Sequence, residues 1–323
     1  MLNQKVFTFG VNNNSKTKKF MIRNVNFNIK VISIGGRGVN ILERLNAFDK
    51  MGIDRIAIGV NEKAFSSIQV KHKIELHAEN GLHGTNDIQS IAENSINEKR
   101  VEIEKSIKGA NALFIVGNLA NDTSCYQIAQ VAKIAKENDI LTFFVGSTPF
   151  TFEGKDKIDL ANKNKLFLEE QVDAVLILES EKIMAEKIKA KEALTKVDKV
   201  LGEIITSIID LVVKFGMINV DFADLKSTIQ NAGLIFFNSV EGDKNEAAAL
   251  IQDLFNKHDL VNKQRTLNKI LYVIYAGSDL LMEEVSFIGD KLRENFNEQA
   301  RIIFGVVSEE KMKNKLKIVL LGV

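Results

Sequence analysis

Five short apolar runs, separated by segments with helical spacing, constrain the fold of this chain most strongly. The runs consist mainly of β-branched residues, Leu and Phe, and they occupy residues 30–34, 55–60, 112–116, 141–145 and 174–178. Helical spacing fills most of the intervals, as at Ile128, Val131 and Ile134. Strands that alternate with helices favour a parallel sheet covered on both faces. Residues 29–188 are therefore predicted to form an α/β domain.

A second pattern begins near residue 189. One apolar stripe continues for roughly seven helical turns within residues 189–215. Gly216 follows as a stop signal. A helix this long typically joins two structural units. Residues 271–274, 302–307 and 317–321 then have strand composition, so residues 216–323 are predicted to form a smaller β-rich domain.

Residues 1–28 precede this regular pattern and differ from it. Two short apolar runs, at residues 6–9 and 20–22, flank an Asn-rich stretch that is typical of turns. The segment is compatible with a hairpin and equally with a flexible arm rich in Asn and Lys.

Composition limits the classes of function. Lys and Arg number 43 and Asp and Glu number 42, so no overall basic field favours nucleic acid as a partner. No apolar run reaches the roughly 18 residues of a transmembrane helix, and the N-terminus lacks a secretory signal. We therefore expect a cytoplasmic protein without direct membrane insertion. The four histidines lack metal-ligand spacing and Cys125 lacks a nucleophile motif, so we expect no metal site and a structural cysteine.

The first predicted strand ends in a glycine-rich turn. Gly35, Gly36 and Gly38 follow it, and a helical pattern comes next. Glycines allow backbone N–H groups to approach a phosphate at a helix N-terminus, although many α/β domains turn tightly there without a ligand. A dinucleotide-binding motif would need a different glycine spacing and an acid after the next strand, and only Glu62 meets the second requirement.

Two carboxylates mark the start of the second domain. Asp221 and Asp224 stand three residues apart, where an apolar, strand-like approach becomes a helical pattern. At that spacing both side chains share one face of a helix. Carboxylates in a first turn are also ordinary helix-start chemistry. The spacing alone therefore leaves a structural role and a functional role open.

Together with Asn219, these two aspartates closely resemble the loop of FtsZ and its tubulin relatives that projects from one subunit into the nucleotide pocket of the next. Other matches follow the family order over roughly residues 29–322. The glycine turn, with Asn40, matches the first glycine loop of the family, and residues 149–154 match its ribose-binding segment. Short stretches within residues 279–285 and 302–306 match its last domain.

The resemblance implies a tubulin/FtsZ-like fold, with a parallel-sheet nucleotide-binding domain, a long central helix and a smaller β-rich C-terminal domain. It also implies two sets of site residues. Asn219, Asp221 and Asp224 would be catalytic and act on the neighbouring subunit. Glu153 would hold the ribose, and Lys157 stands where the family usually has a phosphate-contacting Arg. The implied nucleotide contacts are Gly36, Arg37, Gly38, Asn40, Thr123, Glu153 and Lys157.

The departures from the family concentrate at the phosphate end. FtsZ has Gly-Gly-Gly-Thr-Gly-Thr-Gly there, and of the corresponding residues 120–126 only Thr123 is kept. Side chains would fill space that the family leaves to phosphate oxygens. Asp122 would repel phosphate, or it could cap the helix that starts there. Tyr126 could project into the opening.

Two further positions have alternative interpretations. Arg37 replaces a family glycine, and it could grip phosphate, pair with Asp122 or face solvent. Lys199 aligns with the aspartate that reads guanine, and Leu194 with a stacking Phe. A shift of one residue would offer Asp198 in place of Lys199.

The resemblance therefore predicts an FtsZ-like cytoskeletal protein that forms head-to-tail filaments in cell division or cell shape. GTP or GDP is the implied ligand, Mg²⁺ would enter only with nucleotide, and the altered loop predicts weakened binding and hydrolysis. The alternative is a nucleotide-independent filament or a non-enzymatic partner of a conventional FtsZ. A nucleotide-dependent enzyme unrelated to filaments is a third hypothesis. Because the chain stops directly after the predicted strand 317–321, we expect no C-terminal tethering peptide in it.

Overall fold

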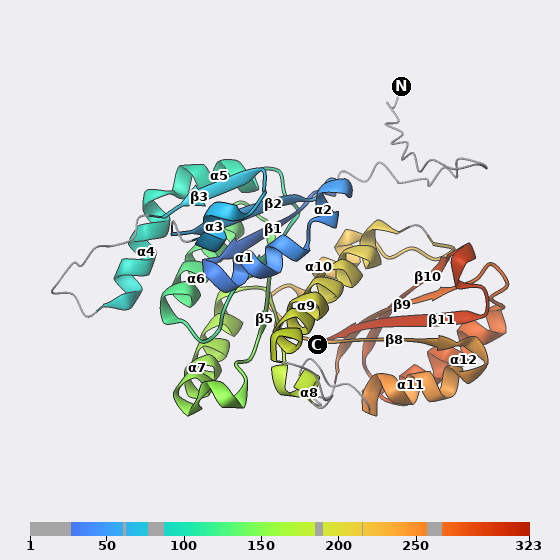
Figure 1. Cartoon of the computed structure of the whole chain (residues 1–323). Coiled ribbons are helices and arrows are strands. Elements are labelled where there is room, and N and C mark those ends of the chain that lie inside the picture. The colour runs from blue at the N-terminus through green and yellow to red at the C-terminus, as the bar shows by residue number, and fades with distance from the viewer. Residues whose placement is uncertain (1–26, 61–62, 77–86, 185–189, 215, 257–266) are drawn as a thin grey trace, which may run out of the picture.

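The computed structural model describes residues 27–60, 63–76, 87–184, 190–214, 216–256 and 267–323. Residues 1–26, Glu62 and three of the four histidines lie outside these ranges, so the expected hairpin or arm is not described. In the described part, two sheets with their own helices are joined by one long helix, α9 (Figure 1). No described helix is both long and apolar enough to cross a membrane.

The first sheet contains seven parallel strands in the order β3-β2-β1-β4-β5-β6-β7. The strands are β1 (Ile29–Ile34), β2 (Asp54–Gly59), β3 (His72–Glu75), β4 (Ala112–Val116), β5 (Leu141–Ser147), β6 (Ala174–Leu178) and β7 (Gly233–Leu234). Every residue of β1, β4, β5 and β6 is buried. This is the reason that these strands read as continuous apolar runs rather than alternating ones.

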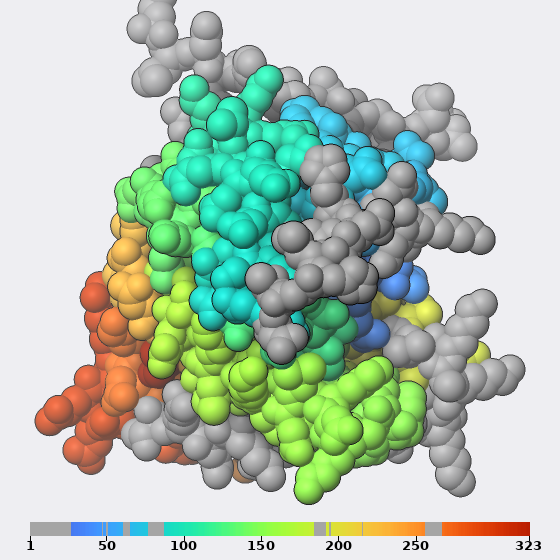
Figure 2. Space-filling view, turned by 90° about the vertical axis from the view of Figure 1, so that its left-hand side faces the viewer, coloured from blue at the N-terminus to red at the C-terminus, as the bar shows by residue number. Residues whose placement is uncertain are grey.

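Helices cover both faces of this sheet (Figure 1). One face carries α4 (Ile88–Glu98), α5 (Arg100–Ile107), α6 (Asp122–Glu137) and α7 (Lys155–Gln171), of which α4, α5 and α7 face the viewer in Figure 2. The other carries α1 (Gly35–Arg44), α9 (Ala190–Val213) and the short helices α2 (Ala47–Lys50), α3 (Lys63–Ser67) and α8 (Ser180–Met184).

The second sheet is mixed, in the order β10-β9-β11-β8, with only β9 and β10 parallel. Its elements are α10 (Phe222–Ile229), β8 (Phe236–Asp243), α11 (Ala247–Asn256), β9 (Lys269–Ala276), α12 (Met282–Arg293), β10 (Arg301–Ser308) and β11 (Lys315–Gly322). Helices α11 and α12 cover one face. Side chains of the other face, such as Leu271 and Val319, share a core with α9. The apolar stripe of α9 therefore serves both sheets, and the expected fold class is confirmed.

The strand order reverses between β1 and β4, which are neighbours in the sheet although β2 and β3 lie between them in sequence. A crevice forms at the carboxyl ends of the strands at such a point, and ligands of open α/β sheets bind there. Helix α1 begins directly after β1, and α6 begins a few residues after β4. The two turns that resemble phosphate-binding loops therefore meet at this crevice.

Candidate functional site at the crevice and the acidic loop

The turn between β1 and α1 is packed tightly against its surroundings. Gly35 has a φ of +72°, a left-handed conformation that favours glycine. A Cβ on Gly35 would lie 2.9 Å from the Ser124 hydroxyl oxygen, and a Cβ on Gly38 would lie 2.5 Å from a carbonyl oxygen of β4. Both glycines are therefore required by the packing of the chain itself. The predicted contacts Gly36 and Asn40 are exposed on α1.

The N-terminus of α6 is capped from within the chain. The Asn121 side chain accepts a hydrogen bond from the backbone N–H of Ser124 at 2.8 Å. Asp122 is the first residue of the helix rather than its cap, so the suggestion that Asp122 caps α6 is wrong: Asn121 holds the extended backbone of a cap residue. The Ser124 side chain is buried against Gly35. Thr123 is half-buried beside it.

Asp122 places a carboxylate at this helix start. Its Oδ2 lies 3.8 Å from the Lys163 ammonium of α7, and its Oδ1 is buried without a hydrogen-bond partner. The suggested pair between Arg37 and Asp122 is therefore not formed, because Lys163 takes that place. The Tyr126 ring does not enter the opening; it packs edge-on against Phe167 of α7, with ring centroids 5.2 Å apart.

Cys125 and His72 are the cysteine and the histidine that the structure describes. Cys125 is fully buried, and burial together with the nearby Asp122 charge raises the pKa of its thiol to about 12. His72 is half-exposed on β3. Within the described residues, His, Cys, Asp and Glu side chains form no group of three or more that could hold a metal ion.

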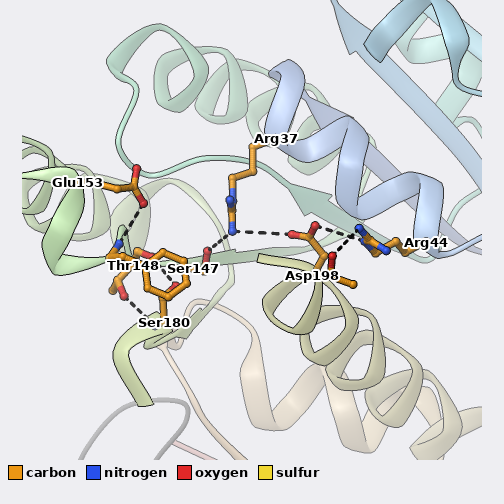
Figure 3. Close-up of polar contacts among 9 residues, drawn as sticks. Arg37, Arg44, Ser147, Thr148, Glu153, Ser180 and Asp198 are labelled. Carbon is orange, nitrogen blue, oxygen red and sulfur yellow. Dashed lines mark hydrogen bonds and ion pairs between the residues drawn. The ribbon is translucent and has the colours of Figure 1, made fainter. Parts of the chain in front are cut away.

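Arg37 reaches across the crevice to α9 (Figure 3). Its Nη2 lies 3.7 Å from Asp198 Oδ1 and donates a 3.4 Å hydrogen bond to the Ser147 hydroxyl at the end of β5. Arg44 of α1 donates to the other Asp198 oxygen at 3.3 Å. The Arg37 side chain is 26% exposed, so the suggestion that it faces solvent is wrong. Ion pairing with Asp198 keeps it in the crevice.

Asp198 rather than Lys199 is the α9 residue that faces the crevice. The Asp198 side chain is 8% exposed, and burial raises its pKa against the opposing effect of Arg37 and Arg44. Lys199 points away and pairs with Glu203, one turn further along α9, at 3.7 Å. Helical periodicity explains the difference, because Asp198 stands three residues before the buried Leu201.

The two residues predicted for ribose and phosphate are bonded to each other. Glu153 ends the 3₁₀ turn η1 (Thr151–Glu153), and its Oε2 accepts from the Lys157 ammonium at 3.2 Å. Its Oε1 accepts from the backbone N–H of Phe150 at 3.0 Å. Next to this turn, the Ser180 hydroxyl donates to the Thr148 carbonyl oxygen at 2.6 Å (Figure 3). The roles of Glu153 and Lys157 toward a ligand stay predictions.

The acidic loop is shaped by reciprocal hydrogen bonds at the start of α10. The Asp221 side chain accepts from the backbone N–H of Asp224 at 2.8 Å, and the Asp224 side chain accepts from that of Asp221 at 3.1 Å. This is a capping box, so the structural interpretation of the spacing is correct. Asn219 accepts from Gly216 N–H at 2.9 Å. Asn219 and Asp221 nevertheless remain exposed, which leaves the functional interpretation intact.

The acidic loop and the crevice lie at different levels along α9. Asp198, which faces the crevice, is the ninth of the 24 residues of the helix, and the loop follows the end of the helix at Val213. At 1.5 Å per residue, the 15 positions between these two residues span about 22 Å. The carboxylates of the loop therefore cannot reach the crevice of their own chain.

An ion-paired lysine fixes the base of the loop. Lys214 Nζ lies 2.7 Å from an oxygen of Asp210 and 2.8 Å from one of Glu309, which follows β10. Backbone hydrogen bonds between Ile218 and Val306 of β10, at 2.8 and 3.2 Å, hold the loop just beyond. The loop is thus tied to the C-terminal sheet at two neighbouring points.

Replacing Lys214 by Met should lower the free energy of unfolding at pH 7 by about 1–2 kcal/mol, because two largely buried carboxylates lose a partner. Burial opposes ionisation of both Lys214 and Glu309. The negative charge of Asp210 and the hydrogen bonds to Asp210 and Glu309 nevertheless raise the pKa of Lys214 above 10.5, and hydrogen bonds from Lys214 and Lys311 lower the pKa of Glu309 below 4.5. The ion pairs of Lys214 therefore make their full contribution to the free energy of unfolding between about pH 5 and pH 10. It disappears as the pH falls through the lowered pKa or rises through the raised one.

Urea unfolding of the unmodified chain and of Lys214→Met as a function of pH measures this contribution to stability. The exposed lysine variant Lys291→Met, which breaks a surface pair with Glu294 on α12, serves as the control and should cost less than about 0.5 kcal/mol. A loss in Lys214→Met that stayed unchanged from pH 7 down to pH 3 would contradict the account.

Comparison with known proteins places this geometry in a family. Residues 28–186 match the family model for the Tubulin/FtsZ family, GTPase domain, and residues 237–322 match that for the FtsZ family, C-terminal domain. The cell division protein FtsZ of Haemophilus influenzae is 30% identical over 327 residues, a match that covers 91% of this chain and 76% of the relative. The chain belongs to the tubulin/FtsZ family.

Other relatives agree with this assignment. FtsZ of Aquifex aeolicus is 28% identical over 301 residues, a match that covers 91% of this chain and 82% of the Aquifex protein. Among solved structures, an FtsZ dimer from M. jannaschii has a TM-score of 0.79 at 25% identity, covering 93% of this chain and 89% of that one. A CetZ protein from Haloferax volcanii has the same fold, with a TM-score of 0.76 at 14% identity, covering 92% of each chain. This is an FtsZ-like protein with relatives in cell division.

Membership of the family implies a guanine nucleotide as a possible ligand, and the crevice fits such a ligand at one end only. Asp198 Oδ1 accepts no hydrogen bond, although Arg37 Nη2 lies 3.7 Å from it, so this oxygen keeps acceptor capacity that an N–H donor of a base could use. The phosphate end does not fit. Ser124 fills the space over Gly35, and the Asp122 carboxylate stands at the helix start where phosphate charge would lie.

Proposed function

We propose that this protein is a cytoplasmic FtsZ-type filament subunit that assembles head to tail, in cell division or cell shape, and binds and hydrolyses GTP weakly. The contrast between the two halves of the site carries the proposal. The capping box holds Asp221 exposed and Asp224 half-buried at the start of α10, whereas Asp122 and Ser124 occupy the phosphate end of the crevice. An FtsZ solved as a dimer and a CetZ protein solved as a GTPγS-bound protofilament support end-to-end assembly.

In this proposal the chain contributes to a site that belongs to its neighbour. The family resemblance assigns Asn219, Asp221 and Asp224 to orienting water in the pocket of the next subunit. Positioning and electrostatics dominate catalysis of phosphoryl transfer. The loop is fixed in position by the length of α9, by its backbone hydrogen bonds to β10 and by the ion pair of Lys214 with Glu309. Contact with a neighbouring subunit would then place these side chains in the pocket of that neighbour.

In the pocket of this chain itself, the proposed nucleotide contacts are Gly36, Arg37, Gly38, Asn40, Thr123, Glu153 and Lys157.

Nucleotide binding is tested by denaturing the purified protein, chromatographing the supernatant for GDP and GTP, and titrating the native protein with GTP. We expect no retained nucleotide and binding only near millimolar GTP. Nucleotide retained in stoichiometric amounts, or steady GTP turnover by the chain alone, would show that the pocket works normally.

Assembly requires a separate measurement. The protein should sediment as filaments at high concentration, with little dependence on added GTP. A chain that remains monomeric in analytical ultracentrifugation, both alone and with a conventional FtsZ, would remove the filament function.

Co-assembly with a conventional FtsZ is the second candidate. It is favoured by one observation, namely that a donor loop with the family residues is kept in a chain whose own phosphate end is filled. In such a subunit the loop would act most effectively on a neighbour that has an intact pocket. Co-sedimentation of the chain with a conventional FtsZ and GTP should then exceed its sedimentation alone. Equal amounts in both pellets would exclude the co-polymer and leave the homopolymer.

A further inference from the structure

A polar cavity lies between the end of α9 and the C-terminal sheet, away from the crevice. Its volume is about 330 Å³, at the low end of the range for ligand sites. Four lysines and two glutamates line it, and Asp210, which pairs with Lys214 at 2.7 Å, reduces the local positive excess to one charge. The lining residues are Lys214, Glu241, Tyr275, Glu309, Lys311, Met312, Lys315 and Lys317.

Tyr275, a lining residue, carries an unused hydrogen-bond donor beside this cavity. The residue lies on β9 and is only 3% exposed, and its hydroxyl oxygen is buried without a hydrogen-bond partner. Burial, with the negative charges of Asp210 and Glu309, raises the pKa of Tyr275, so the phenol stays protonated. A buried donor without an acceptor costs free energy in the folded state. The hydroxyl therefore lacks the acceptor that most buried phenols have.

Lys317 contributes an unused cation to the same cavity. It faces Tyr275 across the β9–β11 ladder, and its Nζ lies 5.8 Å from the centre of the Tyr275 ring. The other three lysines pair with carboxylates, since Lys214 and Lys311 bond Glu309 and Lys315 bonds Glu241. Among the described residues, Lys317 makes neither an ion pair nor a hydrogen bond.

We propose that this cavity binds a small oxyanion, a phosphate or carboxylate group, which accepts a hydrogen bond from the Tyr275 hydroxyl and pairs with Lys317. The two glutamates of the lining are already bonded to lysines, which reduces their repulsion of such a ligand. This site is separate from the crevice and does not depend on the proposed filament function.

The test is a calorimetric titration of the full chain with inorganic phosphate, and in a second series with succinate, at constant ionic strength set by chloride. We expect saturable binding of one oxyanion per chain. Tyr275→Phe and Lys317→Gln should each weaken it at least tenfold, because they remove the donor and the cation while keeping similar volume.

The matched controls are Tyr272→Phe, which removes the neighbouring buried phenol of the same strand, and Lys291→Gln on α12. Both should bind like the unmodified chain. Stronger binding of phosphate or of succinate would support the site and identify the source of the anion. The proposal is overturned if neither anion binds at constant ionic strength, or if a control weakens binding as much as the cavity variants do.

Discussion

Replacing Asp122 and Ser124 together by glycine should raise the affinity of this protein for GTP by roughly a hundredfold to a thousandfold. A carboxylate about 4 Å from a phosphate charge costs on the order of 4 kcal/mol at an effective dielectric near 20, which corresponds to nearly a thousandfold in affinity. Removal of the Ser124 side chain also clears the space over Gly35. Calorimetric titration with GTP measures the change.

The control for this restoration is Glu283→Gly. Glu283 occupies the first turn of α12 in the C-terminal domain, so its replacement removes a carboxylate from a comparable helix position away from the crevice. It should leave the affinity for GTP unchanged. If the double variant folds and still binds GTP no better than the unmodified chain, Asp122 and Ser124 do not limit nucleotide binding.

Replacing Asp221 by Asn should lower the GTP turnover of a mixed filament about a hundredfold, the lower end of what a positioned acid–base or water-orienting group contributes. The mixture contains a conventional FtsZ as the minor component, so that most of its pockets face the acidic loop of this chain. Asn caps a helix about as well as Asp, so the hydrogen bond to the N–H of Asp224 and the thermal stability should persist. Phosphate release per conventional subunit is the measured quantity.

Asp87→Asn is the matched control for this change. Asp87 caps α4 by accepting from the N–H groups of Gln89 and Ser90, and it lies far from the acidic loop. This variant should leave turnover unchanged. A hundredfold loss in Asp87→Asn as well, or no loss in Asp221→Asn with co-sedimentation intact, would refute the donor role.

Much of the fold could be predicted because it depends on continuous apolar patterns. The central strands, buried on both faces, read as unbroken apolar runs, and the stripe of α9 follows from its contact with both sheets. Strands β3, β7 and β8 were not predicted. All three lie at a sheet edge: β3 buries one residue in four, β7 has only two residues, and β8 buries two residues in eight. Edge strands leave weak patterns because only part of their surface is covered.

The crevice was less predictable because it depends on contacts between distant segments. The pair of Arg37 and Asp198 joins residues that are far apart in the sequence, and the geometry of the crevice decides it. The resemblance to the family placed Lys199 at the guanine-reading position, with Asp198 one residue away, whereas the helical period of α9 puts Asp198 on the face of Leu201 and so towards the crevice. Asp122 likewise pairs with Lys163 instead of Arg37, because α7, which carries Lys163, packs beside α6.

The capping box illustrates how one pattern can serve two purposes. The spacing of Asp221 and Asp224 is sufficient to start α10, so a structural role alone would explain it. The exposure of Asn219 and Asp221, and the distance of about 22 Å that α9 puts between loop and crevice, are what favour action on another subunit. Only the three-dimensional structure supplies those two facts.

The most direct test of this division of roles uses a conventional FtsZ whose own acidic-loop aspartates are replaced by asparagine. That partner keeps an intact nucleotide pocket and lacks a functional loop, so it should hydrolyse GTP very slowly alone. Addition of this protein in equal amount should restore phosphate release in step with co-sedimentation, because Asp221 and Asp224 complete the partner's site. Co-sedimentation without any gain in phosphate release would contradict the account.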